Sequence, residues 1–459
     1  MRTPSGVLSV FAALIVSAAP LRGGDPATTI DWIFGGGAAR VAAVPVTRWL
    51  SNGRLLVYDT LGGERAHPFR TLDPVTGGAA PLCDAAKALG SLAALGTPAP
   101  DVLPWPGGID SAGEKAVYLF GGDVFVLDFR LSRFLRLTQT PEEESSVSIS
   151  PDGKWAGWVR ANDIYVEPSG GGREARLTHD GSPATLNGKF SWVYWEEIFG
   201  HSDNAYWWSP DSRSIAFLRT DESMVSEMSF TDFEPYQPRI LTQRYPKAGG
   251  RTPQVRVGFV NVGGGGPVWM DLPQSSYEYV TAVDWLPGGG AAGVQTMNRA
   301  QTDVNLYFVR SADGRPTHIL TETDDAWMHV YHPLFLKEKR EFLWISDRTG
   351  YAQAYRYTLE GGLLGPVTTG ERPLQPYGAF AIYDESPLRA VDEKGGWVYY
   401  TAAGESSIER QIYRVPVGGG EPERISHAAG THSPSFRSDG CFYVDHFSDV
   451  RTPPSLTLR

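Results

Sequence analysis

Two adjacent glutamates, Glu196 and Glu197, lie within a dense run of aromatic side chains. The run reads Ser-Trp-Val-Tyr-Trp-Glu-Glu-Ile-Phe-Gly over residues 191–200, and Tyr-Trp-Trp-Ser-Pro-Asp follows at 206–211. Removing a carboxylate from water is costly unless a partner compensates the charge. Two carboxylates that face a cavity attract a cation, and the free amino group of a peptide is one candidate. From spacing alone, the favoured interpretation is a pair of structural carboxylates bound to a nearby Arg or Lys.

A recurring unit surrounds this segment and must position it. The unit consists of a basic residue with Leu-Thr, a loop, Ser-Pro-Asp-Gly, an alternating apolar strand and Asp-Ile-Tyr-Val, and its clearest copy occupies residues 136–166. Pro-Asp-Gly supplies a turn between antiparallel strands, and the alternation gives each strand two different faces. A period of about 40–55 residues with about four strands is typical of propeller blades. Helical periodicity is weak, and residues 85–95 are the best helix candidate.

The composition favours an all-β protein and excludes several classes. The 459 residues include 52 Gly and 34 Pro spread along the chain, and 12% are aromatic, which is too many for a disordered chain. The net charge of −11 argues against nucleic acid as a partner. Two cysteines, Cys83 and Cys441, do not make a disulfide scaffold. They could pair if the first and last blades are neighbours, but two unrelated buried thiols are the favoured interpretation.

The N-terminus has the pattern of a secretory signal. Arg2 supplies positive charge, and residues 7–19 form an apolar run that is followed by small residues. A membrane anchor or a buried first strand is the alternative, but the run is short for a membrane helix. We therefore expect a signal peptide over residues 1–24, a propeller over residues 25–459, and a periplasmic or secreted protein. No later segment is apolar for long enough to cross a bilayer, so no membrane contact is expected beyond the signal.

The chain resembles the N-terminal domain of the dipeptidyl peptidase IV family over nearly its whole mature length. The most specific matches are the double-glutamate segment and Tyr-Pro-Lys-Ala-Gly at residues 245–249. Further matches lie at residues 30–34, 217–223, 320–323, 342–348, 392–399, 430–433 and 448–454. The resemblance implies an all-β, eight-bladed propeller of four-stranded antiparallel blades. It also implies that Glu196 and Glu197 bind the free amino group of a peptide, with Tyr194, Trp195 and Tyr331 as expected pocket aromatics.

The resemblance also implies a catalytic domain that this sequence does not display. In the family the propeller is followed by an α/β-hydrolase domain with Ser, Asp and His. The chain contains no Gly-x-Ser-x-Gly elbow, since the nearest strings at residues 200–204 and 404–408 lack the final glycine. We therefore expect no catalytic residue and no hydrolase domain in this chain, which should be inactive alone. A separately encoded hydrolase domain is a candidate partner, and the alternative is a free-standing binding or scaffold propeller.

Three further expectations concern the remaining polar residues and surfaces. Family members often hold a substrate carbonyl with an arginine, but the matching loop, residues 140–145, has none, and its glutamates are expected to be solvated. His329 and His332 stand near Asp324 and Asp325 without helical geometry, so no metal site and no cofactor are expected. A surface that would face the hydrolase is left bare, which makes homo-oligomer formation a further expectation.

Overall fold

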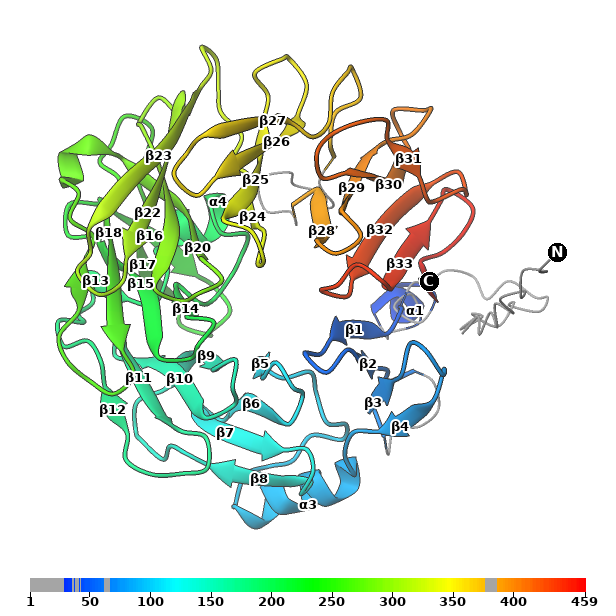
Figure 1. Cartoon of the computed structure of the whole chain (residues 1–459). Helices are drawn as coiled ribbons and strands as arrows, with labels where there is room; N and C mark the ends of the chain where they lie inside the picture. Colours follow the sequence, from blue (N-terminus) through cyan, green and yellow to red (C-terminus); the bar gives the residue numbers. More distant parts are fainter. Residues whose placement is uncertain (1–28, 35–36, 38–40, 42, 62–66, 376–385) are drawn as a thin grey trace.

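The strands of this protein form a ring of small antiparallel sheets around a central opening (Figure 1). The computed structural model describes residues 29–34, 37, 41, 43–61, 67–375 and 386–459. Within these residues six sheets each make one blade, and a larger, seven-stranded sheet contains two more. The predicted all-β, eight-bladed propeller is therefore confirmed. The expected signal peptide of residues 1–24 lies outside the described residues.

Blades 1 to 3 each have four strands, which run in order from the centre of the ring to its rim (Figure 1). Blade 1 contains β1 (Val46–Trp49), β2 (Leu55–Tyr58), β3 (Phe69–Leu72) and β4 (Ala79–Pro81). Blade 2 contains β5 (Gly108–Ile109), β6 (Lys115–Phe120), β7 (Asp123–Asp128) and β8 (Arg133–Arg136). Blade 3 contains β9 (Glu144–Ile149), β10 (Trp155–Arg160), β11 (Asp163–Pro168) and β12 (Ala175–Arg176).

Blade 4 departs from the pattern, because two short strands share its inner edge and a hairpin is inserted. It contains β13 (Thr185–Asn187), β14 (Tyr206–Trp208), β15 (Ser214–Asp221), β18 (Gln254–Asn261) and β19 (Val268–Trp269). The inserted hairpin is a two-stranded sheet of β16 (Glu227–Asp232) and β17 (Arg239–Arg244). Blade 5 contains β20 (Tyr279–Trp285), β21 (Ala291–Met297), β22 (Asp303–Arg310) and β23 (Pro316–Thr323).

Blades 6 to 8 complete the ring. Blade 6 contains β24 (Leu334–Phe335), β25 (Glu341–Ser346), β26 (Gln353–Thr358) and β27 (Leu363–Pro366). Blade 7 contains β28 (Leu388–Asp392), β29 (Trp397–Ala403), β30 (Arg410–Pro416) and β31 (Glu423–Arg424). Blade 8 contains β32 (Thr431–Phe436), β33 (Tyr443–Ser448) and β34 (Ser455–Leu458), so the described part of this blade has three strands.

Helices are few and short. They are α1 (Ile30–Phe34), α3 (Ala85–Ala94), α4 (Trp192–Glu197) and the 3₁₀ helix η1 (Gln274–Ser276). In the part of the chain that the structure describes, none of them has the length and apolar character of a membrane span. The helix predicted at residues 85–95 is confirmed by α3.

The Ser-Pro-Asp-Gly turns join neighbouring strands, as predicted. In blade 3 the hydroxyl of Ser150 donates a hydrogen bond to Asp152 Oδ1 at 2.7 Å, and Gly153 has a φ of +71°. The same arrangement recurs in blade 4 over residues 209–212, where Ser212 takes the positive φ at +62°. A left-handed residue at this point is what reverses the chain within a few residues.

The hydrophobic core lies between neighbouring blades. The fully buried Trp158 of β10 belongs to a cluster that also contains Val117 of blade 2. In the same way, the rings of Phe308 in blade 5 and Phe342 in blade 6 lie 5.7 Å apart. Each blade thus buries its faces against the next, and a single blade would leave both faces exposed to water. Truncating a buried aromatic side chain of this kind costs roughly 3–5 kcal/mol.

The ring closes through side chains at the junction of blades 1 and 8. Leu55 and Leu72 of blade 1 share a buried cluster with Val444 of blade 8. The indole N–H of Trp49 donates a hydrogen bond to the carbonyl of Ser435 at 2.8 Å. Among the described strands, none of blade 1 pairs with blade 8, whereas β30 of blade 7 pairs with β32 of blade 8.

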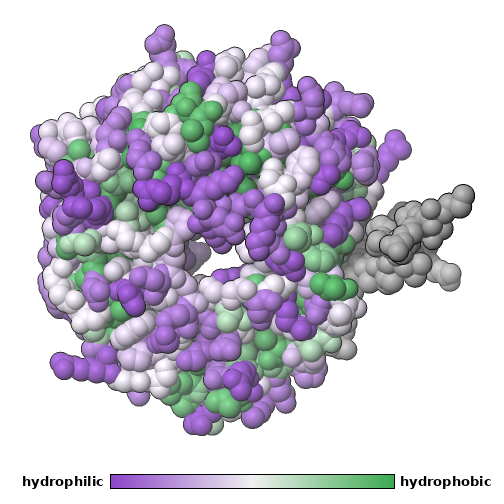
Figure 2. Space-filling model, in the orientation of Figure 1, coloured by the Kyte–Doolittle hydropathy of each residue, from purple (hydrophilic) through white to green (hydrophobic). Residues whose placement is uncertain are grey.

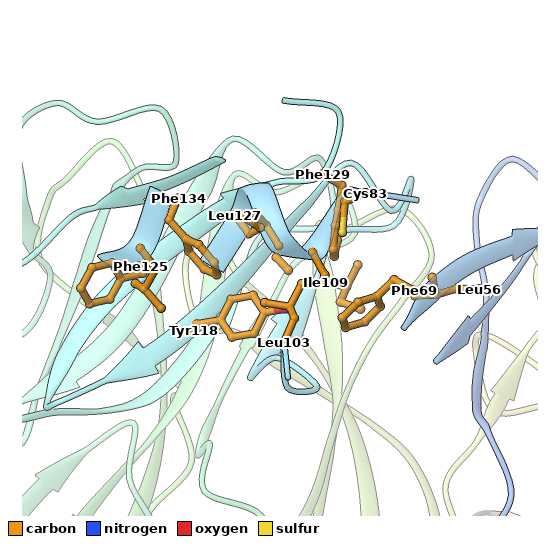
Figure 3. Close-up of a cluster of buried hydrophobic side chains, with 14 of the residues drawn as sticks. Leu56, Phe69, Cys83, Leu103, Ile109, Tyr118, Phe125, Leu127, Phe129 and Phe134 are labelled. Atoms are coloured by element: carbon orange, nitrogen blue, oxygen red, sulfur yellow. The ribbon is translucent and has the colours of Figure 1, made fainter. Parts of the chain in front are cut away.

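Helix α3 fills the space beside blades 1 and 2. Asp84 caps its first turn by accepting a hydrogen bond from the Lys87 N–H at 3.0 Å. On its inner face Leu92 is fully buried. Figure 3 shows the cluster around this helix, to which Phe69 of blade 1 and Phe134 of blade 2 both contribute.

The two cysteines are separate thiols. Cys83 is buried in the cluster under α3, and Cys441 is exposed, so neither forms a disulfide. The expectation that both thiols are buried is therefore wrong for Cys441, because this residue follows a surface turn and its N–H binds the Asp439 carboxylate at 3.0 Å. Burial raises the pKa of the Cys83 thiol to about 12, which keeps it protonated and unreactive.

A hydrogen-bonded contact, here called the blade lock, repeats in four blades. In each, a hydroxyl that follows the outer strand accepts a hydrogen bond from the backbone N–H near the start of the third strand, 14 residues earlier. The pairs are Val124 and Thr138 at 2.8 Å, Ile164 and Thr178 at 3.0 Å, Ala354 and Thr368 at 2.9 Å, and Ile412 and Ser426 at 2.8 Å. The blade lock fixes the point at which the chain leaves one blade for the next.

In blade 3 a buried carboxylate extends the lock. The side chain of Asp163 is fully buried and accepts a hydrogen bond from the Thr178 hydroxyl at 2.6 Å. The same carboxylate also accepts hydrogen bonds from the Arg176 guanidinium at 2.5 Å and from the side-chain amide of Asn187 at 3.0 Å. A buried carboxylate is tolerated only when it is paired and hydrogen-bonded in this way. Because Asn187 belongs to β13, the lock ties blade 3 to blade 4.

We expect Thr178→Val to lower the free energy of unfolding by roughly 2–4 kcal/mol, because it removes one hydroxyl that serves two buried hydrogen bonds. Urea denaturation followed by tryptophan fluorescence measures this change. Thr317→Val, at an exposed position of β23, is the matched control and should change stability by less than about 0.5 kcal/mol. Equal losses in the two variants would contradict the role given to the blade lock.

Blade 8 contains a buried histidine with two acceptors. His432 Nδ1 lies 2.8 Å from Asp445 Oδ2, and Nε2 lies 3.0 Å from the Ala428 carbonyl. Because both neighbours are acceptors, this site can satisfy both N–H groups of an imidazolium ring. Burial acts to lower the pKa of His432, but the hydrogen bonds to Asp445 and Ala428 outweigh burial, and the pKa lies above its ordinary value. Arg459, whose Nε is 4.0 Å from the Asp445 carboxylate, acts weakly in the opposite direction.

A raised folded-state pKa gives His432 a stabilising role that depends on pH. Its contribution to the free energy of unfolding is complete below about pH 6.5, the pKa of histidine in the unfolded chain. This contribution is lost as the pH rises through the pKa that His432 has in the folded protein. We expect His432→Gln to lower the melting temperature most at about pH 6, and progressively less as the pH increases. Thermal melting over a pH series checks this, with the exposed His179→Gln as control. A difference from wild type that stays constant with pH would show that His432 is not charged.

Candidate functional site

The double-glutamate segment folds as helix α4, between blades 4 and 5. Ser191 precedes it in an extended conformation and accepts a hydrogen bond from the Tyr194 N–H at 3.5 Å. Aromatic and β-branched residues of this kind favour strands, so packing has to stabilise so short a helix. The side chain of Tyr194 is fully buried, and its hydroxyl accepts a hydrogen bond from the Val280 N–H of β20 at 3.2 Å. Helix α4 is therefore anchored in the core that blades 4 and 5 share.

The chain reverses directly after α4. Gly200 and His201 both have positive φ angles, of 57° and 62°. The His201 N–H binds the carbonyl of Trp195 at 2.9 Å, and the two side-chain rings stack with their centres 4.2 Å apart. This turn places the imidazole of His201 beside the end of the helix.

The two glutamates have different surroundings. Glu196 is within hydrogen-bonding distance of His201, whose Nε2 lies 2.8 Å from Oε2 of the carboxylate. Glu197 is exposed, and the described part of the chain places no ion-pair partner beside it. Both lie at the C-terminal end of α4, where the helix dipole disfavours negative charge. The ring of His201 engages the carboxylate of Glu196, whereas Glu197 keeps a carboxylate that is free to bind a cation.

A cavity of about 480 Å³ lies beside Glu197. Its wall is formed by α4, by the loop after β17, by β20 and β21, and by the segments that follow β21 and β23. The lining residues are mainly apolar, and they are Val193, Glu197, Ile198, Phe199, Pro246, Lys247, Ala248, Thr252, Tyr279, Thr281, Met297, Arg299, Gln301, Trp327, Met328, Val330 and His332. An apolar wall reduces screening by water, so a charge that enters the cavity interacts more strongly with Glu197 than it would in bulk solvent.

The expected pocket aromatics lie outside this lining. Tyr194 is a core residue, and Trp195 covers His201. Tyr331 is half-buried, and its hydroxyl donates a hydrogen bond to Asp347 at 3.3 Å. The aromatic part of the lining comes instead from Phe199, Tyr279 and Trp327.

Sequence reasoning also missed the basic residues of the cavity wall. Lys247 belongs to the Tyr-Pro-Lys-Ala-Gly motif, which is one of the specific matches to the family. The motif alone does not indicate that Lys247 lines a cavity. Arg299 fastens the same loop to blade 5, since its guanidinium binds the Gly250 carbonyl at 2.9 Å and Glu278 at 2.8 Å. His332 follows β23, and its Nδ1 lies 2.9 Å from Asp284 of β20.

The loop at residues 140–145 is not wholly solvated, contrary to expectation. Glu144 is buried, accepts a hydrogen bond from the Thr140 hydroxyl at 2.8 Å, and pairs with Arg160 at 3.2 Å. Arg160 also binds Glu174 with both of its terminal nitrogens. Glu144 can be buried because this arginine neutralises it, and only the two preceding glutamates are exposed.

Over the described residues, no group of three or more His, Cys, Asp or Glu side chains is arranged to hold a metal ion. His332 is paired with Asp284, and His329 packs against the ring of Trp327 with 4.8 Å between ring centres. The cavity thus combines a largely apolar wall with the carboxylate of Glu197 and the basic side chains of Lys247, Arg299 and His332.

Comparison with known proteins agrees with this architecture. A crystal structure of dipeptidyl peptidase 4 from Porphyromonas gingivalis superposes with a TM-score of 0.77 and 23% identity, covering 95% of this chain and 60% of that one. A putative dipeptidyl aminopeptidase IV from Bacteroides ovatus gives a TM-score of 0.69 and 18% identity, covering 90% and 57%. Because the sequence identities are below 25%, these two structural similarities show a shared fold and nothing more.

Sequence relatives lead in the same direction. Dipeptidyl peptidase 4 of Arthroderma otae is 27% identical over 352 residues, which cover 72% of this chain and 43% of that protein. The enzyme of the same name from Trichophyton rubrum is 26% identical over 348 residues, with the same coverage. The matched region thus spans less than half the length of these relatives. The profile of the dipeptidyl peptidase IV (DPP IV) N-terminal region matches residues 115–454, and the chain belongs to this family.

Proposed function

We propose that this propeller binds peptides through their free N-terminus and positions them for a dipeptidyl peptidase of the DPP IV type. Glu197 is the principal acceptor of the ammonium group, and Glu196 supports it. Neither residue takes part in bond making. The hydrolysis itself belongs to an α/β-hydrolase domain, which is part of the proposal and for which no residue of this chain is assigned.

The observation that carries the proposal is the unequal state of the two glutamates. The carboxylate of Glu196 is engaged by the His201 ring at 2.8 Å, whereas Glu197 lines the cavity and has no ion-pair partner among the described residues. A carboxylate at the C-terminal end of a helix costs stability rather than adding to it. Residues that break a local rule in this way are expected at functional sites.

The chemistry of an ammonium group fits this arrangement. An ammonium has three donors, and charge-assisted hydrogen bonds to carboxylates are short and strong. The neighbouring apolar wall, which includes Ile198, Phe199 and Val330, can receive a side chain of the same peptide. A site that holds the terminal ammonium also sets the distance from the N-terminus to any bond that a hydrolase attacks.

A free-standing binding propeller without a catalytic partner remains the alternative, and it predicts the same binding without hydrolysis. The proposal includes a location outside the cytoplasm, which rests on the apolar run at residues 7–19 that follows Arg2.

The binding of free and acetylated peptides tests the proposal. We expect Ala-Ala-Ala amide to bind the full chain, and its N-acetylated form to bind much more weakly, because acetylation removes the positive charge. Glu197→Gln should weaken binding of the free peptide by roughly 1.5–3 kcal/mol, the range for hydrogen bonds to charged groups. Glu196→Gln should have a smaller effect, because His201 already occupies this carboxylate. NMR titration or calorimetry gives the affinities.

Glu405→Gln is the matched control, since this glutamate is exposed on the turn between β29 and β30 of blade 7. Its affinity for the free peptide should equal that of wild type. Equal affinity of wild type for the free and acetylated peptides, or unchanged binding in Glu197→Gln, would refute an amine site at this position.

A further inference from the structure

The wall of the cavity beside Glu197 has an unusual balance of charge. Three basic side chains, Lys247, Arg299 and His332, line it against one acidic side chain, Glu197. The whole chain has the opposite balance, with a net charge of −11. Basic groups are thus concentrated on this wall, although the protein as a whole is acidic. A ligand that brought only an ammonium group would use Glu197 and leave the basic groups without a role.

Two of the three basic groups already have carboxylate partners. Arg299 Nη1 lies 2.8 Å from Glu278, and His332 Nδ1 lies 2.9 Å from Asp284. Neither Glu278 nor Asp284 lines the cavity. These pairs hold the walls in place. In particular, Arg299 also binds the Gly250 carbonyl and so fixes the loop that carries Lys247.

Lys247 is the basic group that remains available. Its side chain is exposed, and no carboxylate of the described residues lies within ion-pairing distance. Its backbone is well fixed, because its carbonyl accepts a hydrogen bond from the Gly250 N–H at 2.7 Å and the preceding Tyr245 ring packs 4.5 Å from that of Trp192. The cavity lining therefore includes one open carboxylate on α4 and one open ammonium on the loop after β17.

Between the charged groups the wall is largely apolar, with Thr252, Thr281 and Gln301 as its uncharged polar side chains. Met297 and Met328 are buried beneath the cavity, and Tyr279 and Val330 pack against them. A neutral polar group placed here gains only hydrogen bonds, whereas an anion could also pair with the charge of Lys247. The wall thus favours a ligand with two opposite charges over one with a single charge.

We propose that this cavity selects peptides whose first residue carries a carboxylate in its side chain. Glu197 binds the terminal ammonium, and Lys247 binds the side-chain carboxylate. The inference rests on the proposed function for the ammonium half of the ligand, and it adds a substrate class, N-terminal acidic peptides, and a specificity-determining residue, Lys247.

Four peptides separate the two halves of the site. They are Asp-Ala-Ala amide, Asn-Ala-Ala amide and the N-acetylated form of each, in which the C-terminal amide removes any other carboxylate. We expect the free Asp peptide to bind the full chain roughly fivefold more tightly than the free Asn peptide, the size of a partly exposed ion pair. Lys247→Gln should abolish this preference, so that the free Asp and Asn peptides bind the variant with equal affinity.

Lys394→Gln, an exposed lysine in the turn after β28, is the control and should keep the preference. Equal affinity for the free Asp and Asn peptides would overturn the selection of acidic peptides, and a remaining effect of acetylation would leave the amine site standing. A preference for Asp in both the free and acetylated pairs, with no effect of acetylation, would support Lys247 and refute the amine site. A preference for Asp that survives Lys247→Gln would exclude Lys247 as its cause.

Discussion

The buried carboxylate of Asp163 is the interaction on which the position of the candidate site depends. It joins the lock of blade 3 to Asn187, and Asn187 ends the first strand of blade 4. Four residues later Ser191 caps helix α4. The direction in which the chain enters α4 is therefore set by a charge that is fully buried and satisfied on every side. Removing one partner would leave part of this charge uncompensated, which is far more costly than the hydrogen bond itself.

Helix α4 starts from this fixed point and ends at Glu197, whose carboxylate is exposed. Tyr194 anchors the helix in the core of blades 4 and 5, and the left-handed turn at Gly200 stops the chain from continuing along the same axis. The helix is too short to be stable alone, so its orientation follows from packing rather than from its own propensity. The result is that Glu196 turns toward His201, whereas Glu197 lines the cavity. The same residue type at adjacent positions thus acquires two different surroundings through geometry alone.

The sequence allowed much of the fold to be predicted, because its signals are local. Pro-Asp-Gly turns and alternating strands can be recognised from consecutive residues, and the helix α3 can be predicted from residues 85–95. The glutamate pair could be found in the same way. The cavity could not, because its wall combines α4 with Lys247, Arg299 and His332 from distant loops. The helical state of α4 is a tertiary effect that overrides strand propensity. The burial of Glu144 depends on Arg160, which is 16 residues away.

Ring closure and the candidate site lie at opposite places in the propeller. Closure joins blades 1 and 8 by side-chain packing around Val444 and by the hydrogen bond from Trp49, without backbone pairing among the described strands (Figure 1). Counted around an eight-bladed ring, the boundary between blades 4 and 5 is the farthest from this junction. Figure 2 shows the central opening that separates the two sides, set in a largely hydrophilic face. Because blades contact only their neighbours, loosening at the closure is transmitted through several interfaces before it reaches α4.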